Sequence, residues 1–388
     1  MLFSTAPGRG LSPAHSRALD GLRALAILLV LLVHSPRQGA PAAYLAVTRY
    51  GWTGVDLFFV LSGFLIGGQL LASAGTRPGS WLWQFYGRRL LRILPAYLAT
   101  VAVYFLVRPL REDESARLSL LRYLTFTMNF AHEGGNFTHA WSLCIEEQFY
   151  LLMPLGVMLL KGWLRPWQVV SIAGLLLAGG ILLRLGLWSH YLGPRPSEAL
   201  VRAGFWKWIY FPTWSRLDGL LAGVLLASVR HAQPSVWSAW RAAPRRWAGG
   251  ALLLLALGAF LVPRCRSLWG AALVFPVLAL GFGSLMVFAL SPPGERLLGR
   301  VPGSSLLARL AYSLYLTHRL AFNAVDALLT PHGVSAYHPL RILTSAAAIL
   351  LFAAALHWAV ERPFLRLRDR WVPAPPSTAS PSRPWAFR

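Results

Sequence analysis

Long runs of apolar residues, separated by short polar segments, dominate this chain. A transmembrane α-helix needs about 20 predominantly apolar residues. The runs that approach this length are residues 22–36, 53–74, 91–107, 141–160, 168–187, 208–228, 247–262, 270–290, 306–325 and 342–360. The pattern therefore predicts an all-α polytopic membrane protein with about ten transmembrane helices.

The distribution of basic residues predicts the orientation of these helices. Lys and Arg are enriched in the cytoplasmic loops of membrane proteins. Alternate polar segments of this chain, beginning with residues 1–23, carry the larger share of its Lys and Arg. We therefore expect both termini in the cytoplasm and a multi-pass location in the inner (cytoplasmic) membrane.

This topology divides the chain into three parts. Residues 1–18 are predicted to form an N-terminal cytoplasmic segment, and residues 19–370 the transmembrane domain. Residues 371–388 are rich in Pro and Ser, a composition typical of disordered segments.

Composition supports the membrane assignment. Of the 388 residues, 56% are hydrophobic and only 13% are charged, whereas soluble domains carry about 25% charged residues. The net charge of +23 would also suit a nucleic-acid partner. Because the basic residues lie mostly between the hydrophobic runs, membrane topology explains them better, and we expect membrane lipid and not nucleic acid around this chain.

Arg23 and His34 lie in the same apolar run, eleven positions apart. A helix turns about 100° and rises 1.5 Å per residue, so the two side chains share one face about 16 Å apart. An ionisable residue inside a membrane helix usually faces a protein-lined cavity. The pair thus predicts a fixed cation near one end of a cavity and a titratable base near the other. The alternative is a flanking topology charge and a histidine that extends to the membrane surface.

Further acids and bases fall near the outer ends of the predicted spans. They are Asp56, His139, Glu146, Glu147 and His318. The predicted topology places them at a depth similar to that of His34. A carboxylate beside an imidazole is the pairing that general-base chemistry uses. Each residue taken alone also fits a polar group at the membrane edge.

Three arginines, Arg88, Arg89 and Arg92, are predicted on the cytoplasmic side. Guanidinium groups bind phosphates through forked pairs of hydrogen bonds. A phosphorylated cytosolic donor such as coenzyme A would fit them, although positive charge on the inner side is also expected from topology alone. No metal-binding, P-loop or dinucleotide-binding pattern is visible, so we expect no metal and no tightly bound cofactor.

Several motifs together resemble the membrane acyltransferase-3 family, whose members O-acylate sugars and related acceptors. The resemblance covers residues 17–370. The motifs are LDGLRALAILLVLLVH (19–34), GVDLFFVLSGFLI (54–66), FYGRRLLRILPAY (85–97), HAWSLCIEEQFYLLMP (139–154), SRLDGLLAGVLLA (215–227), YSLYLTH (312–318) and ERP (361–363). Ala140 stands where Thr is common in that family.

The resemblance implies a function and a set of site residues. It implies acyl-CoA, often acetyl-CoA, as the co-substrate and a carbohydrate hydroxyl as the acceptor. Arg23 and His34 match the family's Arg-x10-His pair, in which the histidine is regarded as essential for catalysis. Glu146 matches its acid, and its RRxxR segment falls on Arg88, Arg89 and Arg92.

The sequence therefore predicts an integral-membrane O-acyltransferase, with a proton-coupled transporter or flippase of a sugar or lipid-linked substrate as the alternative. Lipopolysaccharide, another cell-envelope polysaccharide, a glycolipid and a small metabolite all remain open as acceptors. The acyl chain length, the oligomeric state, a covalent acyl-enzyme and the side of the membrane on which transfer ends also remain open.

Overall fold

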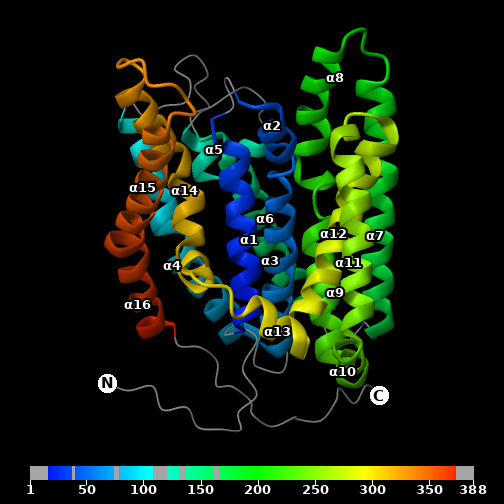
Figure 1. Cartoon of the computed structure of the whole chain (residues 1–388). Helices are drawn as coiled ribbons and strands as arrows, with labels where there is room; N and C mark the ends of the chain where they lie inside the picture. Colours follow the sequence, from blue (N-terminus) through cyan, green and yellow to red (C-terminus); the bar gives the residue numbers. More distant parts are fainter. Residues whose placement is uncertain are drawn as a thin grey trace.

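Helices form all the regular secondary structure in the part of the chain that the computed structural model describes (Figure 1). The described residues are 16–36, 40–73, 78–107, 120–130, 137–160 and 166–372. This confirms the all-α prediction. The predicted disordered tail and most of the N-terminal segment lie outside the described residues.

The described residues in the first half of the chain form five long α-helices and three short ones. They are α1 (Arg17–His34), α2 (Ala42–Thr48), α3 (Thr53–Ser73), α4 (Pro78–Leu106), α5 (Leu120–Leu124), α6 (Trp141–Leu160), α7 (Pro166–Leu187) and α8 (Glu198–Gly204). The second half continues with α9 (Asp218–Ala232), α10 (Pro234–Ala242), α11 (Pro244–Leu261), α12 (Leu268–Ala289), α13 (Pro292–Leu298), α14 (Ser304–Leu329), α15 (Pro339–Leu356) and α16 (Arg362–Trp371).

Six helical segments among the described residues are long and apolar enough to cross a membrane. They are Ala42–Leu71, Trp81–Leu106, Val170–Leu192, Pro244–Arg264, Leu268–Ala289 and Pro339–Trp371. The chain is therefore a multi-pass membrane protein, while the count of about ten spans and the sides of the termini stay predictions. Helices α1, α6, α9 and α14 are not among the six, and each of them carries ionisable side chains.

Two predicted spans have different boundaries in the structure. The span expected at 208–228 is interrupted: a π-helical turn ends at Tyr210, and α9 begins only at Asp218. The span expected at 91–107 is the second part of a longer helix that begins at Pro78. The arginines at 88, 89 and 92 therefore lie on α4 itself and not in a loop before it.

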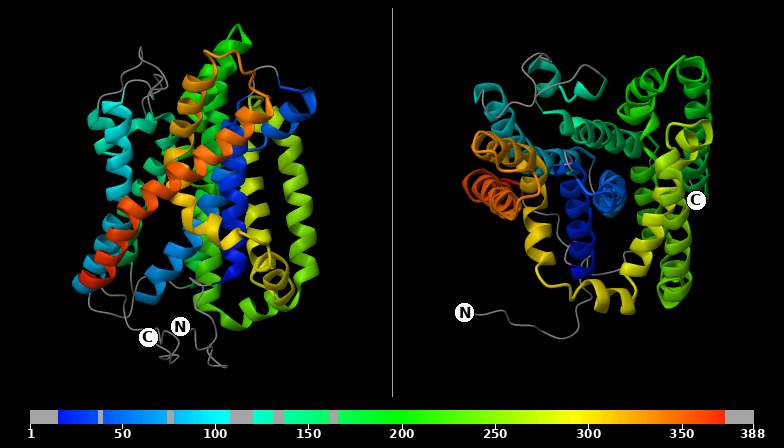
Figure 2. Two further views of the ribbon diagram at one scale, coloured as in Figure 1. Left: turned by 60° about the vertical axis from the view of Figure 1, so that its left-hand side comes forward. Right: turned by 45° about the horizontal axis from the view of Figure 1, so that its top comes forward.

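The helices form two groups on either side of α1 and α3 (Figures 1 and 2). Helices α7, α9, α11 and α12 pack together on one side, and α4 lies with α14, α15 and α16 on the other. The chain of α15 and α16 is helical without a break from Pro339 to Trp371. This arrangement places α1 at the centre of the molecule.

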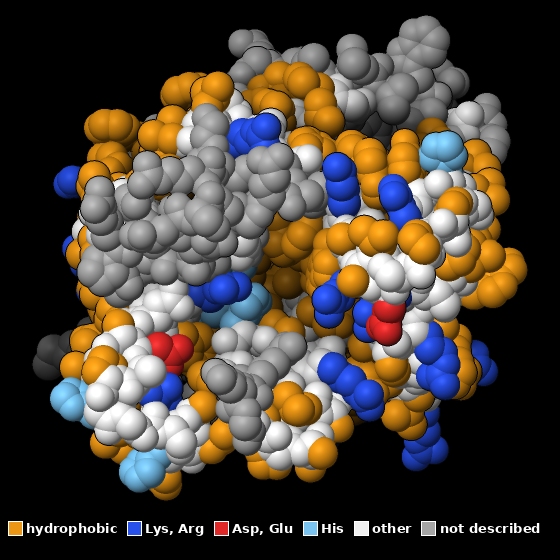
Figure 3. Space-filling view, turned by 90° about the horizontal axis from the view of Figure 1, so that it is seen from above, with side chains coloured by type: hydrophobic (Ala, Val, Ile, Leu, Met, Phe, Trp, Pro, Cys, Tyr) orange, Lys and Arg blue, Asp and Glu red, His pale blue; other side chains and the backbone are white. Residues whose placement is uncertain are grey.

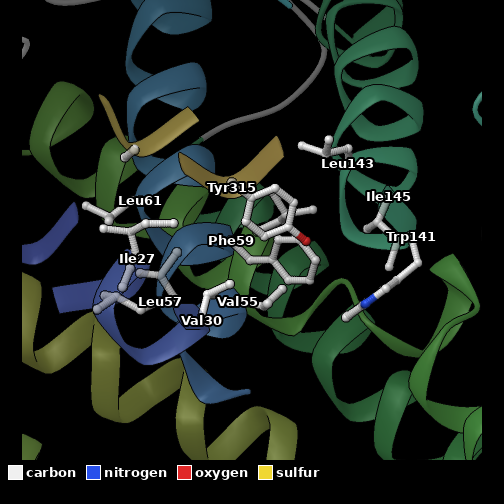
Figure 4. Packing of buried hydrophobic residues seen from close by; sticks show 14 of the residues in the cluster. Ile27, Val30, Val55, Leu57, Phe59, Leu61, Trp141, Leu143, Ile145 and Tyr315 are labelled. Atoms are coloured by element: carbon white, nitrogen blue, oxygen red, sulfur yellow. The ribbon is translucent and has the colours of Figure 1, made fainter. Parts of the chain in front are cut away.

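A buried apolar cluster joins α1, α3, α6 and α14 at that centre (Figure 4). Its members include Ile27, Val30, Val55, Leu57, Phe59, Leu61, Trp141, Leu143, Ile145 and Tyr315. Burial of a side chain of this size stabilises a fold by about 1.5–3 kcal/mol in water. Inside a membrane, where lipid is also apolar, close packing supplies the specificity instead.

Glycines allow α3 and α9 to approach closely. A Cβ atom on Gly63 would lie 2.1 Å from the carbonyl oxygen of Leu220, and one on Gly223 would lie 2.2 Å from the carbonyl oxygen of Val60. Real Cβ contacts are not this short, so only glycine fits at either position. Small residues at membrane helix interfaces have this effect.

Candidate functional site

Helix α1 carries Arg23 and His34 toward opposite ends of the molecule. The helix begins at the lower end in Figure 1, so Arg23 lies in its lower half, and His34 is its last residue at the upper end. Ser16 caps the helix by accepting a hydrogen bond from the backbone N–H of Leu19. The eleven-residue spacing therefore holds on a continuous helix, as the sequence predicted.

Three histidines from distant parts of the chain meet at the upper end of α1. His34 lies 4.8 Å from His318 on α14 and 6.0 Å from His139, measured between ring centroids. His139, in the 3-10 turn Thr138–Ala140 before α6, lies 4.6 Å from His318. The sequence predicted only a common depth for them, whereas the structure brings the rings into contact.

Backbone carbonyls fix the proton on two of these rings. The Nδ1 atom of His34 lies 2.9 Å from the carbonyl oxygen of Val30, and Nδ1 of His318 lies 2.8 Å from that of Tyr315. Since a carbonyl oxygen can only accept a hydrogen bond, both Nδ1 atoms are assigned as donors. In the neutral rings the basic lone pair therefore resides on Nε2, on the side that faces away from the ring's own helix.

The three rings differ in their access to solvent. His139 and His318 are buried, whereas His34 is half-buried. Seen from above, the upper surface is hollowed near its centre, with hydrophobic side chains in the hollow and histidine and basic side chains at its edge (Figure 3). Of the three rings, His34 is thus the one that is open to solvent.

Tyr315 ties this cluster to α6, a role that the sequence did not indicate. Its hydroxyl donates a hydrogen bond of 2.6 Å to the carbonyl oxygen of His139. Because that hydroxyl has one proton, Ser142 donates the second bond, also of 2.6 Å, to the Tyr315 oxygen. Both residues belong to quoted motifs, and their place in those motifs was the only available signal.

A second cluster, of arginines, lies on the lower half of α1 and on α4. Arg23 forms an ion pair of 3.1 Å with Asp20, and its positive charge also interacts with those of Arg89 and Arg92. Arg92 is exposed to solvent, so its guanidinium is accessible to a ligand. Grouped guanidinium groups of this kind suit an anion, phosphate above all.

Glu146 and Glu147 lie close to the arginine cluster. Ser62 donates a hydrogen bond of 2.7 Å to Glu146, and the Glu146 charge interacts with those of Arg89 and Arg92. Glu147 interacts with Arg89, whose guanidinium lies 4.3 Å from the ring centroid of Tyr150. A supporting role of Glu146 toward His34 stays a prediction.

Arg88 differs from the two other arginines of its segment. It donates hydrogen bonds to the carbonyl oxygen of Val372, at 2.5 Å, and to Asp369, at 3.3 Å. Both partners lie at the end of the α16 segment. Arg88 therefore links α4 to the α16 segment.

Asp56 is paired with an arginine that the sequence analysis did not single out. Its carboxylate lies 3.1 Å from Arg216, and both side chains are buried. The Arg216 guanidinium also lies 3.8 Å from the ring centroid of Phe275 and 4.9 Å from that of Tyr210. The described contacts thus give Asp56 a structural partner instead of the imidazole that the depth argument suggested.

A second buried ion pair lies beside the first. Arg184 of α7 holds the Asp218 carboxylate through two hydrogen bonds of 2.8 and 3.0 Å, and it donates a third, of 2.8 Å, to the carbonyl oxygen of Ser215. These bonds satisfy the Asp218 carboxylate and the backbone carbonyl of Ser215 in the interrupted segment. Where a helix is interrupted inside a membrane, its backbone N–H and C=O groups need hydrogen-bond partners within the protein.

No group of three or more His, Cys, Asp or Glu side chains in the described ranges is placed to hold a metal ion. Imidazole rings such as the three at the upper end of α1 can accept and donate protons. Together with the arginines below, they provide one end suited to an anion and another suited to proton transfer.

Comparison with known proteins gives one family and a set of relatives. A family model described as an acyltransferase domain matches residues 16–360. An O-acetyltransferase OatA of Staphylococcus aureus is 30% identical over 232 residues, which are 56% of this chain and 35% of that protein. A peptidoglycan O-acetyltransferase OatA of Listeria monocytogenes is 30% identical over 230 residues, or 55% and 33%.

The chain thus matches about a third of the length of these curated relatives. A putative O-acetyltransferase of S. aureus shows the same proportion, with 30% identity over 223 residues that cover 54% of this chain and 34% of that protein. No solved structure matches the chain significantly.

Proposed function

Because the chain belongs to the acyltransferase domain family, we propose that it is an integral-membrane O-acyltransferase that moves an acetyl group from acetyl-CoA to a hydroxyl of a cell-envelope carbohydrate. Its relatives are O-acetyltransferases, and one of them carries peptidoglycan in its name. A polysaccharide of this class is the acceptor that we propose.

One observation supports the proposal most strongly: a single helix links the arginine cluster to the histidine cluster. Arg23 interacts with Arg89 and Arg92 at one end of α1, and His34 contacts His318 at the other. Coenzyme A has phosphates at one end and a thioester at the end of a long, thin arm. A donor that spans the two clusters would have its phosphates at the arginines and its acyl group near the imidazoles.

In the proposed reaction His34 acts as the general base. Its Nε2 lone pair takes the proton of the acceptor hydroxyl, and the oxygen attacks the thioester carbonyl carbon. The C–S bond then breaks, and the leaving thiolate takes the proton from His34. Because His34 is the last residue of α1, the negative end of the helix dipole stabilises the imidazolium that forms in between.

Radiolabelled acetyl-CoA tests this function. The full-length protein in nanodiscs, given the labelled donor and peptidoglycan fragments or other envelope glycans, should produce a base-labile labelled ester. The variant His34→Ala should lose activity by a factor of about 10²–10⁴, the usual contribution of a general base. The exposed His190 provides a matched control, and His190→Ala should retain activity.

Two results would contradict the proposal. Full activity of His34→Ala in protein that is inserted and abundant would remove His34 from the reaction. Movement of unlabelled glycan across a vesicle membrane, with no ester formed from any acceptor, would point to the transporter alternative.

A further inference from the structure

His318 has no role in the reaction described so far, yet its environment is unusual. The side chain is completely buried, and Nδ1 is engaged by carbonyl oxygens of its own helix, 2.8 Å from Tyr315 and 3.2 Å from Leu314. Its Nε2 atom has no hydrogen-bond partner among the residues that the structure describes. A buried acceptor left in this state costs about 1–3 kcal/mol, so a donor that completes it would stabilise the site.

The rings of His139 and His34 both lie beside His318, at 4.6 and 4.8 Å between centroids, and of the two neighbours only His34 is open to solvent and can take up a proton from a substrate. The rings of His34 and His318 are inclined by 58° to each other. Since both Nδ1 atoms are bound to their own helices, both Nε2 atoms lie on the sides turned away from α1 and α14, which pack against each other. If both rings are neutral, each Nε2 atom is a hydrogen-bond acceptor and neither can donate to the other. One additional proton between them would form a hydrogen bond that both Nε2 atoms share.

We propose that His318 is a positioning residue that accepts the proton which His34 removes from the acceptor hydroxyl. This inference rests on the proposed function and deepens it. The acceptor O–H bond breaks and an N–H bond forms on Nε2 of His34. That proton is then shared with, or passed to, Nε2 of His318, and it returns through His34 to the leaving thiolate when the C–S bond breaks.

The solvent exposure of His34 and His318 is consistent with these two roles. His34 is half-buried and can meet a substrate, while His318 lies behind it and cannot be reached by water. In hydrolases with a serine nucleophile, a buried carboxylate behind the histidine stabilises the imidazolium. Here the described carboxylates Glu146 and Asp56 are engaged with Ser62 and Arg216, and a second imidazole occupies the position behind the base.

Other groups face His318 and will influence its titration. They are His34 from α1, His139 from the turn before α6, and Arg319 and Tyr315 from α14 itself. Tyr104 of α4 lies beside His139, at 6.3 Å between ring centroids. The permanent charge of Arg319 opposes a second positive charge nearby, so the cluster is expected to hold one proton at a time.

Two substitutions test the proposal by activity. His318→Leu removes the acceptor, and His318→Gln keeps a hydrogen-bond acceptor that cannot hold the proton. Both should lower kcat about 10²-fold with little change in KM, at the lower end of the range for general acid–base groups. In His318→Leu the protonated form of His34 loses its partner, so the acid limb of the pH–rate profile should move to lower pH. The buried His357, which pairs with Glu361 at 2.8 Å, provides the control, and His357→Gln should leave kcat and the acid limb in place.

A second measurement does not depend on activity. In full-length protein labelled with ¹⁵N-histidine in nanodiscs, the His34 and His318 signals should titrate together, with the His34 signal assigned from the His34→Ala difference spectrum. Independent titration of His34, or a wild-type kcat and acid limb in His318→Gln and His318→Leu, would overturn the proposal. If the wild-type protein forms no ester, the proposed function fails, and the joint titration still decides whether the two rings share a proton.

Discussion

At the scale of single residues, Asp56 and His34 show how two ionisable side chains at similar predicted depth can have different neighbours. Both lie at the end of an apolar run, and the sequence places them at similar depth. Asp56 is buried against Arg216, whose guanidinium lies among aromatic rings. His34 instead contacts two other titratable rings and is partly open to solvent. The role of Asp56 is therefore best tested by stability and that of His34 by rate.

The variant Asp56→Asn should destabilise the protein. It leaves the charge of Arg216 buried without a counter-ion, and breaking a buried pair in this way costs about 3–5 kcal/mol. The double variant Asp56→Asn/Arg216→Gln should recover part of the loss because no unmatched charge remains. Thermal unfolding in detergent, followed by fluorescence-detected size exclusion, measures both. A stable Asp56→Asn protein with a selective loss of kcat would instead support a catalytic role for Asp56.

At the scale of elements, the contact of α3 with α9 depends on glycines that leave no room for a side chain. Gly63 faces the backbone of Leu220, and Gly223 faces that of Val60. Asp56 and Arg216 lie near the same contact and join α3 to the segment before α9. This contact holds the central helices to the group formed by α7, α11 and α12.

The variant Gly63→Ala should therefore destabilise the protein by about 1–3 kcal/mol, the usual cost of overpacking. Gly68 lies on the same helix, and a Cβ atom placed on it would meet no described atom within 4 Å. The control Gly68→Ala should be neutral or slightly stabilising, since alanine favours helix by about 1 kcal/mol over glycine. Thermal unfolding midpoints of the two variants measure the difference. Equal midpoints would mean that α3 and α9 can move apart to accommodate a methyl group at little cost.

At the scale of the whole molecule, two clusters occupy opposite ends of one helix. The lower cluster contains Arg23, Arg89 and Arg92, and the upper one contains His34 and His318. If the donor spans this distance, substitutions at the lower end should change donor affinity, and substitutions at the upper end should change the rate of transfer.

The variant Arg92→Ala should raise the KM for acetyl-CoA about 10- to 100-fold, because a hydrogen bond to a charged group is worth about 1.5–3 kcal/mol. Arg88→Ala should change that KM less than about threefold, since Arg88 is bound to Val372 and Asp369 instead. Initial rates over a range of donor concentrations distinguish the two variants. Equal effects would indicate that total positive charge, and not the Arg92 position, attracts the donor.

Much of this molecule could be predicted from the sequence because hydrophobic runs and motifs are local signals. Helix α1 with Arg23 and His34, the helical class and the family all follow from such signals. The pairing of Asp56 with Arg216 and the contact of His34 with His318 join residues far apart in the chain. No periodicity records such contacts, so depth in the membrane was the nearest available guide. For the same reason, the sequence could not distinguish Arg89 and Arg92, which lie near Arg23, from Arg88.

The two buried ion pairs also have a consequence for how the protein is made. A charged side chain at the centre of an inserting helix costs about 2.5–3.5 kcal/mol on the scale measured for the translocon. The interrupted segment 211–217 and α9 bring in Arg216 and Asp218, whose partners Asp56 and Arg184 lie on α3 and α7. Both partners are translated earlier. During synthesis, each counter-ion therefore enters the bilayer before the charged residue that pairs with it. In a circular permutant that begins at residue 205, Arg216 and Asp218 would have to insert before their partners.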